Sequence, residues 1–340
     1  MFAHALRGVE TYFTVAMEDS YESKITHEDF EPETVFHEIA TLANQLSDLF
    51  KTELTPRQEA GFENHILHSL ALMVHGSNKI EKAGSSSDIT LELCVAVFRG
   101  EEIPEEIEEQ DQEYLPLKKS LISQHLPADI SDVLRSRREV VQHAKAAKFT
   151  MDQLCIRGQN LSEQIILEAH RILTYKVDAE TTPWMEYSGV YRSHEVSVGL
   201  HAFPHPSLVP SKMQSMFCEL KRDLKEVTRN GTIDPIALAS KYAHIFVNIH
   251  PFIDGNGRMC RLILNSILLK FGAFIACIGV DEDDRSIYGD VAVNGGALED
   301  LYEDAEEEEK PKLYKELASY VLAHVKKSMT VLVSAVVNEV

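Results

Sequence analysis

Apolar residues recur at helical spacing along most of the chain, and this pattern predicts a mainly α-helical fold. Over residues 33–50 the apolar side chains return every three or four positions, as they do on the buried face of a helix. Thr55 and Gln58 then have the spacing of a capping box, with a proline at the first helical position. We expect the helix that they open to break at Gly76.

Two further predicted helices lie side by side in the sequence. Asp234 suits an N-cap, Pro235 suits the first helical position, and apolar residues follow on one face as far as His250. The helix should end there, because the residue before a proline is disfavoured in the helical conformation. A second helix is expected over residues 256–272, with its terminal glycine in a left-handed conformation.

The short loop between these helices places two glycines and two arginines at a helix N-terminus. Backbone N–H groups are unpaired in the first helical turn and the helix dipole is positive there, so Gly255 and Gly257 allow an anion to approach closely. Arg258 and Arg261 share one face of that turn, where each cation opposes the dipole by roughly 0.3–1 kcal/mol. This arrangement favours a bound polyanion such as a nucleoside triphosphate.

Two more groups with suitable chemistry complete the cluster. The Asp254 carboxylate suits a magnesium ion that also binds phosphate oxygens. His250 carries the side chain that titrates near neutral pH, as a general base requires. The alternative, a solvated polar turn between two helices, leaves the paired arginines and the double glycine unexplained.

Residues 250–261 also resemble a known family. Their sequence, HPFIDGNGRMCR, matches the Fic signature, His-x-Phe-x-(Asp/Glu)-Gly-Asn-(Gly/Lys)-Arg-x-x-Arg, at every defined position. The resemblance implies a Fic-type helical domain with a small β-hairpin flap, plus additional N-terminal helices. It also implies a protein adenylyltransferase, which moves AMP from ATP to a Ser, Thr or Tyr hydroxyl of a protein, with ATP and Mg²⁺ as cofactors.

The same resemblance implies roles for individual residues. His250 would be the catalytic base and Asp254 the metal ligand. The residues expected to bind the nucleotide through phosphates or adenine are Gly255, Asn256, Gly257, Arg258, Arg261, Tyr288 and Asn294.

A second Fic-like motif lies upstream, where residues 77–81 match the inhibitory pattern (Ser/Thr)-x-x-x-Glu-(Gly/Asn) except at its last position, Lys82. We expect one short helical turn closed by Gly84. The resemblance implies that Ser77 and Glu81 belong to an inhibitory element in which Glu81 pairs with Arg261. In some relatives the same glutamate aligns a water for AMP removal, so a bifunctional enzyme stays open. The alternative is a solvated surface turn.

The predicted flap spans residues 188–199, where valines alternate and glycines bound the segment. The proline-rich residues from His201 onward are expected to end regular structure. The resemblance implies that the flap docks the target by strand addition. The flap residues expected to meet the target are Val190, Tyr191, Val196 and Val198.

Histidines near the flap invite a different interpretation. A metal cluster of His194, His201 and His205 is disfavoured, because prolines fix the chain and no carboxylate or cysteine completes the site. His170, on the helix expected to precede the flap, is predicted to be a packed or surface histidine and not a catalytic one.

Composition limits the partners and the compartment. The chain has 340 residues, of which 33 are basic and 54 acidic, giving a formal net charge of −21 that disfavours nucleic acid. Its 5 cysteines are scattered, which disfavours a disulfide framework and favours a reducing compartment. No run of 18 apolar residues appears, so the sequence predicts a cytoplasmic protein without a membrane partner.

The remaining segments are organised around this centre. Residues 101–113 carry eight acidic and no basic residues and are expected to form a solvated loop, with a docking site for a basic partner as the alternative. A cationic helix over residues 130–155 is expected to offset this charge. We divide the chain into an N-terminal helical region (1–128), a catalytic core (129–310) and a C-terminal helix (311–340).

The C-terminal helix, opened by Pro311, ends in an apolar stretch over residues 329–337. Core packing explains this stretch, and a self-association face, hence a homodimer, is the second choice.

Two other functions remain open at this point. One is a different transfer at the same phosphate nest, of a phosphoryl or phosphocholine group. The other is a catalytically silent nucleotide-binding interaction module.

Overall fold

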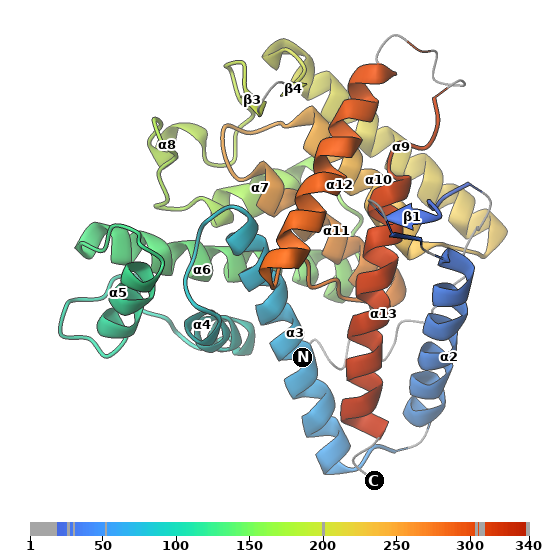
Figure 1. Ribbon diagram of the computed structural model, residues 1–340, viewed down its shortest axis with the longest axis horizontal. Coiled ribbons are helices and arrows are strands. Elements are labelled where there is room, and N and C mark those ends of the chain that lie inside the picture. The colour runs from blue at the N-terminus through green and yellow to red at the C-terminus, as the bar shows by residue number, and fades with distance from the viewer. Residues whose placement is uncertain are drawn as a thin grey trace.

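Helices make up nearly all of the regular structure, and the expected mainly α fold class is confirmed (Figure 1). The structure is a computed structural model and describes residues 19–25, 28–29, 31–51, 53–198, 201–302, 305 and 310–337. Within these ranges the strands form two hairpins of two residues per strand, β1 (Lys24–Ile25) with β2 (Glu28–Asp29) and β3 (Ser197–Val198) with β4 (His201–Ala202).

The helices lie close to the segments in which apolar residues recur at helical spacing. The first group is α2 (Pro32–Phe50), α3 (Pro56–Ile80), α4 (Ser87–Arg99), α5 (Tyr114–Ser123) and α6 (Ile130–Met151), which a π-helical turn (Asp152–Ile156) continues. The second group is α7 (Glu163–Leu173), α8 (Trp184–Tyr187), α9 (Val209–Asn230), α10 (Pro235–Ile249), α11 (Asn256–Gly272), α12 (Glu282–Leu301) and α13 (Lys315–Val337).

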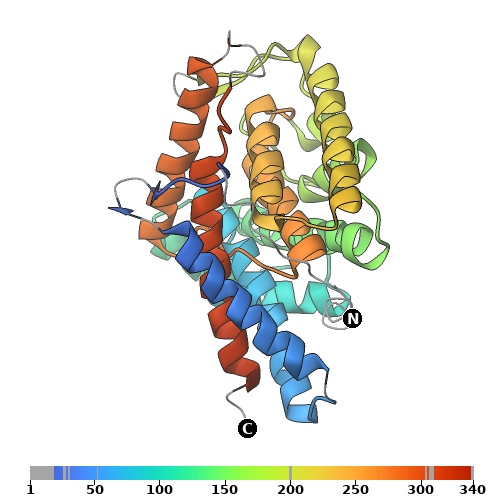
Figure 2. The same cartoon turned by 90° about the vertical axis from the view of Figure 1, so that its right-hand side faces the viewer.

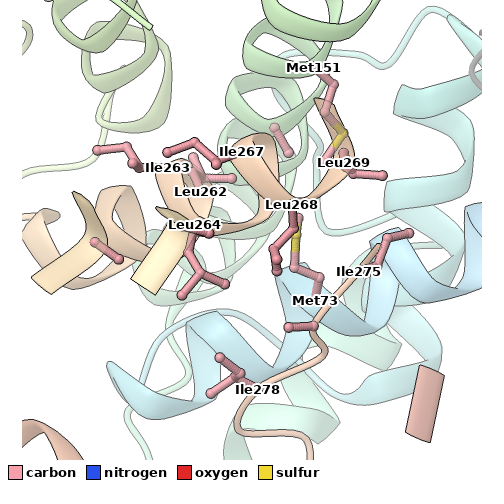
Figure 3. Close-up of a cluster of buried hydrophobic side chains, with 14 of the residues drawn as sticks. Met73, Met151, Leu262, Ile263, Leu264, Ile267, Leu268, Leu269, Ile275 and Ile278 are labelled. Atoms are coloured by element: carbon pink, nitrogen blue, oxygen red, sulfur yellow. The ribbon is translucent and has the colours of Figure 1, made fainter. Parts of the chain in front are cut away.

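Helix α11 lies at the centre of the hydrophobic core, in contact with α3, α6, α7 and α10. Its apolar side chains are buried on more than one face: Leu268 lies beside Met73 of α3, and Leu269 lies beside Met151 of α6 (Figure 3). A helix with apolar residues on more than one face has to be enclosed by other elements. Packing on all sides therefore fixes the position of the N-terminal turn of α11, where the candidate site lies.

The two ends of the described chain meet in one group of helices. Helices α2, α3 and α13 lie together in the lower part of both views (Figures 1 and 2), and α13 contacts α2, α3 and α10. Met329, Leu332, Val333 and Val336 of α13 are buried in the core. Packing within the chain therefore accounts for the apolar end of α13.

The main hydrophobic core is continuous along the chain. One cluster of buried residues includes Ile39 of α2, Val141 of α6, Leu268 of α11 and Val333 of α13, so it joins all three segments into which the sequence was divided. A second, smaller cluster connects α5 to the start of α6 and contains Ile107, Tyr114, Leu117, Leu121 and Val133. Among the described residues, every helix is too short or too polar to cross a lipid bilayer.

The acidic segment before α5 is a loop whose charges are partly paired with the cationic helix α6. Arg137 Nε donates to Glu113 at 2.7 Å, and Arg138 Nη2 donates to Glu106 at 2.9 Å. Lys176, which follows α7, lies 3.1 Å from Glu105. The cations of α6 therefore neutralise part of the neighbouring acidic charge.

The expectation that α3 breaks at Gly76 is wrong. The helix continues through Gly76 to Ile80, so Ser77 to Ile80 form its last turn and not a separate short one. A Cβ atom at position 76 would lie 2.2 Å from the carbonyl oxygen of Ile278. Glycine is needed here because another backbone packs directly against the helix, and a glycine with this role does not interrupt helical hydrogen bonding.

Replacing Gly76 with alanine tests this packing role. We expect the free energy of unfolding to fall by roughly 3 kcal/mol, the upper part of the range for overpacked cores, because the clash is with backbone. Urea denaturation followed by circular dichroism measures the change. Gly289 of α12 has no atom within 4 Å of an added Cβ. The control Gly289→Ala should therefore raise stability by about 0.5–1 kcal/mol. A Gly76→Ala protein as stable as this control would contradict the explanation.

Candidate functional site

The N-terminal turn of α11 provides unpaired backbone donors. Gly255 caps the helix in a left-handed conformation, with φ of 82°. The first intrahelical hydrogen bond runs from the N–H of Met259 to the carbonyl of Gly255 at 2.9 Å. The N–H groups of Asn256, Gly257 and Arg258 therefore have no acceptor within the helix, as an anion-binding turn requires.

The side chain of Asn256 has a different place from the one expected. Its Oδ1 accepts from the N–H of Phe252 at 2.9 Å, and its Nδ2 donates to the carbonyl of Phe252 at 2.8 Å. The side chain is buried and closes the loop on itself, because both of its polar atoms satisfy backbone groups that the tight turn leaves unpaired. Within Asn256, only the backbone N–H is left for a phosphate.

His250 follows the last residue of α10 and is fixed in a left-handed conformation, with φ of 49°. For a residue with a Cβ this conformation costs roughly 1–2 kcal/mol. The Nδ1 atom lies 3.2 Å from the carbonyl oxygen of Val247, which can only accept, so Nδ1 carries the proton. Nε2 is then unprotonated and is the atom that can take a proton from a substrate.

Burial keeps this imidazole neutral. The pKa of His250 is lowered to about 4, first because the ring is buried, and also because Arg192 and His201 lie nearby, while the Val247 carbonyl and Glu81 act in the opposite direction. The ring of Phe203, just after β4, stacks on it at a centroid distance of 3.8 Å. The expectation that His250 titrates near neutral pH is therefore wrong. A neutral, oriented imidazole can still accept a proton at neutral pH, although its lowered pKa makes it a weaker base than a free histidine.

His170 of α7 is packed in the core, as predicted, and it supports the loop that contains Asp254. Its Nδ1 accepts from the N–H of Gly189 at 2.9 Å, so its Nε2 is the donor to the carbonyl of Asp254 at 2.9 Å. The ring stacks on Phe252 at 3.6 Å, and burial lowers its pKa to about 4. This histidine therefore holds the backbone of Asp254, a role that nothing in the sequence indicated.

The donor set around Asp254 fits a metal that brings most of its own ligands. The Asp254 side chain is 39% exposed, and its Oδ2 accepts from Arg258 Nη2 at 3.1 Å. Nowhere in the described ranges do three His, Cys, Asp or Glu side chains converge as a preformed metal site. One exposed carboxylate beside unpaired helix N–H groups suits Mg²⁺ carried by a nucleotide, because Mg²⁺ is often bound by one or two carboxylates plus phosphate oxygens.

Arg258 is buried with unused donors. Its Nε and Nη1 atoms have no hydrogen-bond partner among the described residues. Buried donors without acceptors are rare in folded proteins and point to a missing polar ligand or water.

Arg261, one turn further along α11, draws its partners from two distant parts of the chain. From the last turn of α3, Ser77 Oγ accepts from Nε at 2.8 Å, and the Ser77 carbonyl accepts from Nη2 at 3.0 Å. Glu81 Oε1 accepts from Nη2 at 2.6 Å. The hydroxyl of Tyr288, on α12, accepts from Nη1 at 3.4 Å. The structure thus brings Ser77 and Glu81 to the guanidinium.

The Glu81 carboxylate also occupies the space over the phosphate nest. A Cβ atom added to Gly257 would lie 2.1 Å from Glu81 Oε1. The carboxylate therefore lies directly against the first turn of α11, where the backbone N–H groups are unpaired. A phosphate that accepts hydrogen bonds from the same donors would have to displace it.

The end of α3 is a Schellman motif with lysine at the position that usually holds glycine. The N–H of Ala83 donates to the Asn78 carbonyl at 2.9 Å and the N–H of Lys82 donates to the Lys79 carbonyl at 3.2 Å. Lys82 takes φ of 55° to make this turn. The departure from the inhibitory pattern therefore leaves the fold of the turn unchanged but places a side chain in a strained conformation.

Helix α6 holds this turn from its other side. Glu139 accepts from the N–H of Gly84 at 2.7 Å, and Ser136 Oγ donates to the Gly84 carbonyl at 2.9 Å. His143 Nδ1 lies 2.7 Å from Asn78 Oδ1. Four buried polar residues thus hold Glu81 in its position, and sequence reasoning missed all of them because their partners are 52–65 residues away.

The two residues expected at the adenine lie on different faces of α12. Tyr288 is buried against Arg261, its ring 5.4 Å from the guanidinium carbon. Asn294 is exposed and donates to Glu316 of α13 at 3.1 Å, so the structure does not bring it to the site. A helix turns about 100° per residue, so a residue seven positions after Tyr288 shares its face and one six positions after does not. The residue seven positions after Tyr288 is Gly295, which lies against His244.

The hairpin is shorter and later than residues 188–199. Ser197 pairs with Ala202 and Val198 pairs with His201, so the expectation that regular structure ends at His201 is wrong. A proline restricts itself and the residue before it, which leaves His201 and Ala202 free to pair. The residues between the strands lie outside the described ranges.

The expected flap residues are therefore dispersed. Val190 lies in a bend before the hairpin and is 50% exposed. Tyr191 is turned inward: its hydroxyl donates to Glu163 of α7 at 2.9 Å, and its ring lies near Phe252. Val196 is half-buried beside β3. Val198 lies in β3, but its side chain is outside the described part of the structure.

A protein-family model described as the Fic/DOC family matches residues 160–268, which contain α7, the hairpin, the loop over residues 250–255 and both arginines of α11. The chain contains a Fic/DOC family domain. The resemblance recognised in the signature is thereby confirmed at the level of the family.

Relatives share parts of this Fic domain. The chain is 37% identical over 97 residues to a Fido domain-containing protein of Dictyostelium discoideum, which is 28% of this chain and 65% of that protein. It is 31% identical over 135 residues to a Nematostella vectensis protein named Protein adenylyltransferase Fic, covering 39% of this chain and 29% of the relative. The Drosophila yakuba protein of the same name is 35% identical over 107 residues, 32% and 19% of the two chains. Each match thus covers less than two thirds of the relative.

Solved Fic structures have a similar fold over nearly the whole chain. A Fic domain containing signaling protein from Bacteroides thetaiotaomicron has a TM-score of 0.62 at 17% identity, over 90% of this chain and 97% of that one. Fic-1 from C. elegans has a TM-score of 0.57 at 18% identity, over 91% and 74%. At these identities the likeness concerns the fold, and it confirms the Fic-type helical architecture.

The strained Lys82 gives a testable prediction about the turn that carries Glu81. Lys82→Gly should raise the free energy of unfolding by about 0.5–1 kcal/mol, because relief of the left-handed strain exceeds the entropy that glycine loses on folding. Urea denaturation measures this change. Lys221 is an exposed lysine inside α9. Lys221→Gly should therefore lower stability by about 1 kcal/mol. A loss of stability in both variants would show that Lys82 is not strained.

Proposed function

We propose that this protein is an adenylyltransferase that moves AMP from ATP to a hydroxyl of a protein substrate, and that Glu81 holds the site closed until it is displaced. The observation that carries the proposal is a neutral, oriented His250 beside an anion-binding helix N-terminus. In addition, relatives that share the Fic domain bear the name protein adenylyltransferase.

The residues present can perform each step of such a transfer. Nε2 of His250 takes the proton of the target hydroxyl, whose oxygen attacks the α-phosphorus. The bond from that phosphorus to the β-phosphate oxygen then breaks, and pyrophosphate leaves. Backbone N–H groups of the first turn of α11, together with Arg258 and Arg261, bind the phosphates and stabilise the developing charge. Mg²⁺ held by Asp254 would neutralise phosphate charge.

The proposed inhibition follows from competition for the same donors. Arg261 cannot donate hydrogen bonds to a γ-phosphate while it donates them to Ser77 and Glu81. The Glu81 carboxylate also lies against Gly257. A carboxylate is a suitable competitor, because it accepts hydrogen bonds from a guanidinium as a phosphate does. Nucleotide then binds productively only when the end of α3 moves or its carboxylate turns away.

Replacing His250 with alanine tests the base. In a Glu81→Gly background, His250→Ala should lower the transfer of label from α-labelled ATP by at least roughly 10²-fold, because proton removal contributes about 10²–10⁴-fold. ATP affinity, measured by calorimetry, should stay within a few-fold. His37→Ala, which removes an exposed histidine of α2, should leave both quantities unchanged.

Parallel reactions with α- and γ-labelled ATP separate the competing functions. Label from the α position alone supports AMP transfer, whereas label from the γ position alone would indicate a kinase. Undiminished α-labelling in His250→Ala would remove this residue from its proposed role. ATP binding without transfer of either label, even with glycine at position 81, would rule out both AMP and phosphoryl transfer. It would leave a catalytically silent module or the transfer of phosphocholine from another donor.

Replacing Glu81 tests the inhibition. Glu81→Gly should raise the rate of self-modification by roughly 5- to 150-fold, the range that a coupling of about 1–3 kcal/mol produces. Glu81→Gln, which loses the charge but keeps the shape, should give an intermediate rate. Mass spectrometry after incubation with ATP and Mg²⁺ detects the added AMP and its acceptor. Glu180→Gly, at an exposed loop position, is the control and should match wild type. Equal rates for Glu81→Gly and wild type would contradict the inhibitory role.

A further inference from the structure

Arg192, between α8 and the hairpin, is a buried cation whose donors all point to backbone carbonyls. Nε donates to His250 at 2.7 Å, Nη1 donates to His194 at 3.0 Å, and Nη2 donates to Pro204. The residue is 3% exposed. Among the described residues no carboxylate lies within ion-pair distance of it. Glu195 acts on it only at longer range.

These three carbonyls belong to the hairpin segment and to the loop that begins at His250, and the relative position of these two parts has to stay constant. His194 precedes β3 and Pro204 follows β4, so Arg192 closes the base of the hairpin. The third carbonyl belongs to His250 itself, and the N–H of Arg192 donates to the next carbonyl, that of Pro251, at 2.9 Å. A single side chain thus joins the hairpin to the catalytic loop.

A ring contact beside Arg192 extends this link to the imidazole of His250. Phe203, next to Pro204, stacks on the His250 ring at 3.8 Å with an interplanar angle of 17°. His250 is also held in a left-handed backbone conformation that its own side chain disfavours. The hydrogen bond to its carbonyl restrains the backbone of His250, and the ring of Phe203 restrains the orientation of its imidazole.

We infer that Arg192 is a positioning residue, which fixes His250 against the hairpin so that its Nε2 faces the bound substrate. A buried guanidinium without an ionic partner is expensive to retain, and three carbonyls arranged around its planar fork explain why arginine occupies this place. Lysine could not replace it, because a single ammonium nitrogen cannot reach three separated acceptors at once.

The positive charge has a second effect on the same imidazole. Three charged or titratable groups act on His250: Arg192, His201 of β4, and Glu81 after α3. Among these three groups Arg192 has the largest effect, and it lowers the pKa of the imidazole. Its removal should therefore raise that pKa, whereas a lysine at the same place should preserve it.

Two variants separate the geometric part from the electrostatic part. This experiment rests on the proposed function and uses the Glu81→Gly protein so that transfer is measurable. Arg192→Lys should lower kcat by roughly 10²-fold, the cost of a misplaced catalytic group, with the KM for ATP changed by less than about 3-fold. Arg192→Gln should lower kcat similarly. Arg222→Gln, at an exposed arginine of α9, is the control and should leave both constants unchanged.

Magnetic resonance of the imidazoles gives a second readout that does not need turnover. His250 is assigned by the signal lost in His250→Ala, and its pKa should stay near 4 in Arg192→Lys and rise in Arg192→Gln. The cross-peak between the rings of Phe203 and His250 should weaken in both variants. If Glu81→Gly transfers nothing, so that the proposed function fails, these two signals still decide the role of Arg192.

The inference is overturned if folded Arg192→Lys keeps kcat within about 2-fold of its parent, or if its ring cross-peak is unchanged. Should Arg192→Gln fail to fold, Arg192→Lys decides alone. A rise of the KM for ATP as large as the fall in kcat would also overturn it, because it would place Arg192 in nucleotide binding.

Discussion

A buried guanidinium has to be supplied with acceptors, and in this protein that requirement links three helices, α11, α3 and α12. Arg261 lies in the core-filling helix α11, 3% exposed, where an unpaired cation would be strongly unfavourable. Ser77 and Glu81 at the end of α3 and Tyr288 of α12 provide the acceptors. Protein groups therefore surround a cation that faces the proposed phosphate site.

Polar contacts help to hold the acceptor Glu81, while its neighbour Ile80 packs against the main hydrophobic core. Glu81 is the C-cap residue of a Schellman turn that continues with a strained lysine, and Glu139 and Ser136 of α6 bind the backbone of Gly84 beyond it. Such contacts contribute roughly 0.5–1.5 kcal/mol each, so a competing polyanion faces a modest barrier. Helix α11 beneath the site is enclosed in the main hydrophobic core. The fold thus combines a fixed set of donors with an acceptor that is easier to displace.

His250, the proposed base, depends on a similar combination of parts distant in sequence. Its backbone is set by the end of α10 and the following proline, its carbonyl is bound by Arg192, and its ring is covered by Phe203. On the other side, His170 fixes Asp254 through its carbonyl. His170 and His250 therefore have similarly lowered pKa values but different positions. His170 is enclosed and structural, whereas His250 lies at the edge of the nest with its Nε2 unprotonated.

The sequence by itself determined the elements and the local centre of the site. Capping residues and helical periodicity predicted α2, α10 and α11, and the spacing from His250 to Arg261 placed its glycines and arginines at one helix N-terminus, because all of these relations are local in the chain. Tertiary structure decided the rest. Gly76 is a contact with Ile278 and not a break, Asn294 faces α13 and Tyr191 faces α7. Arg192, His170 and Glu139 act through backbone atoms of remote segments, and a carbonyl or N–H looks the same at every position of a sequence. Only the packing of the helices brings them together.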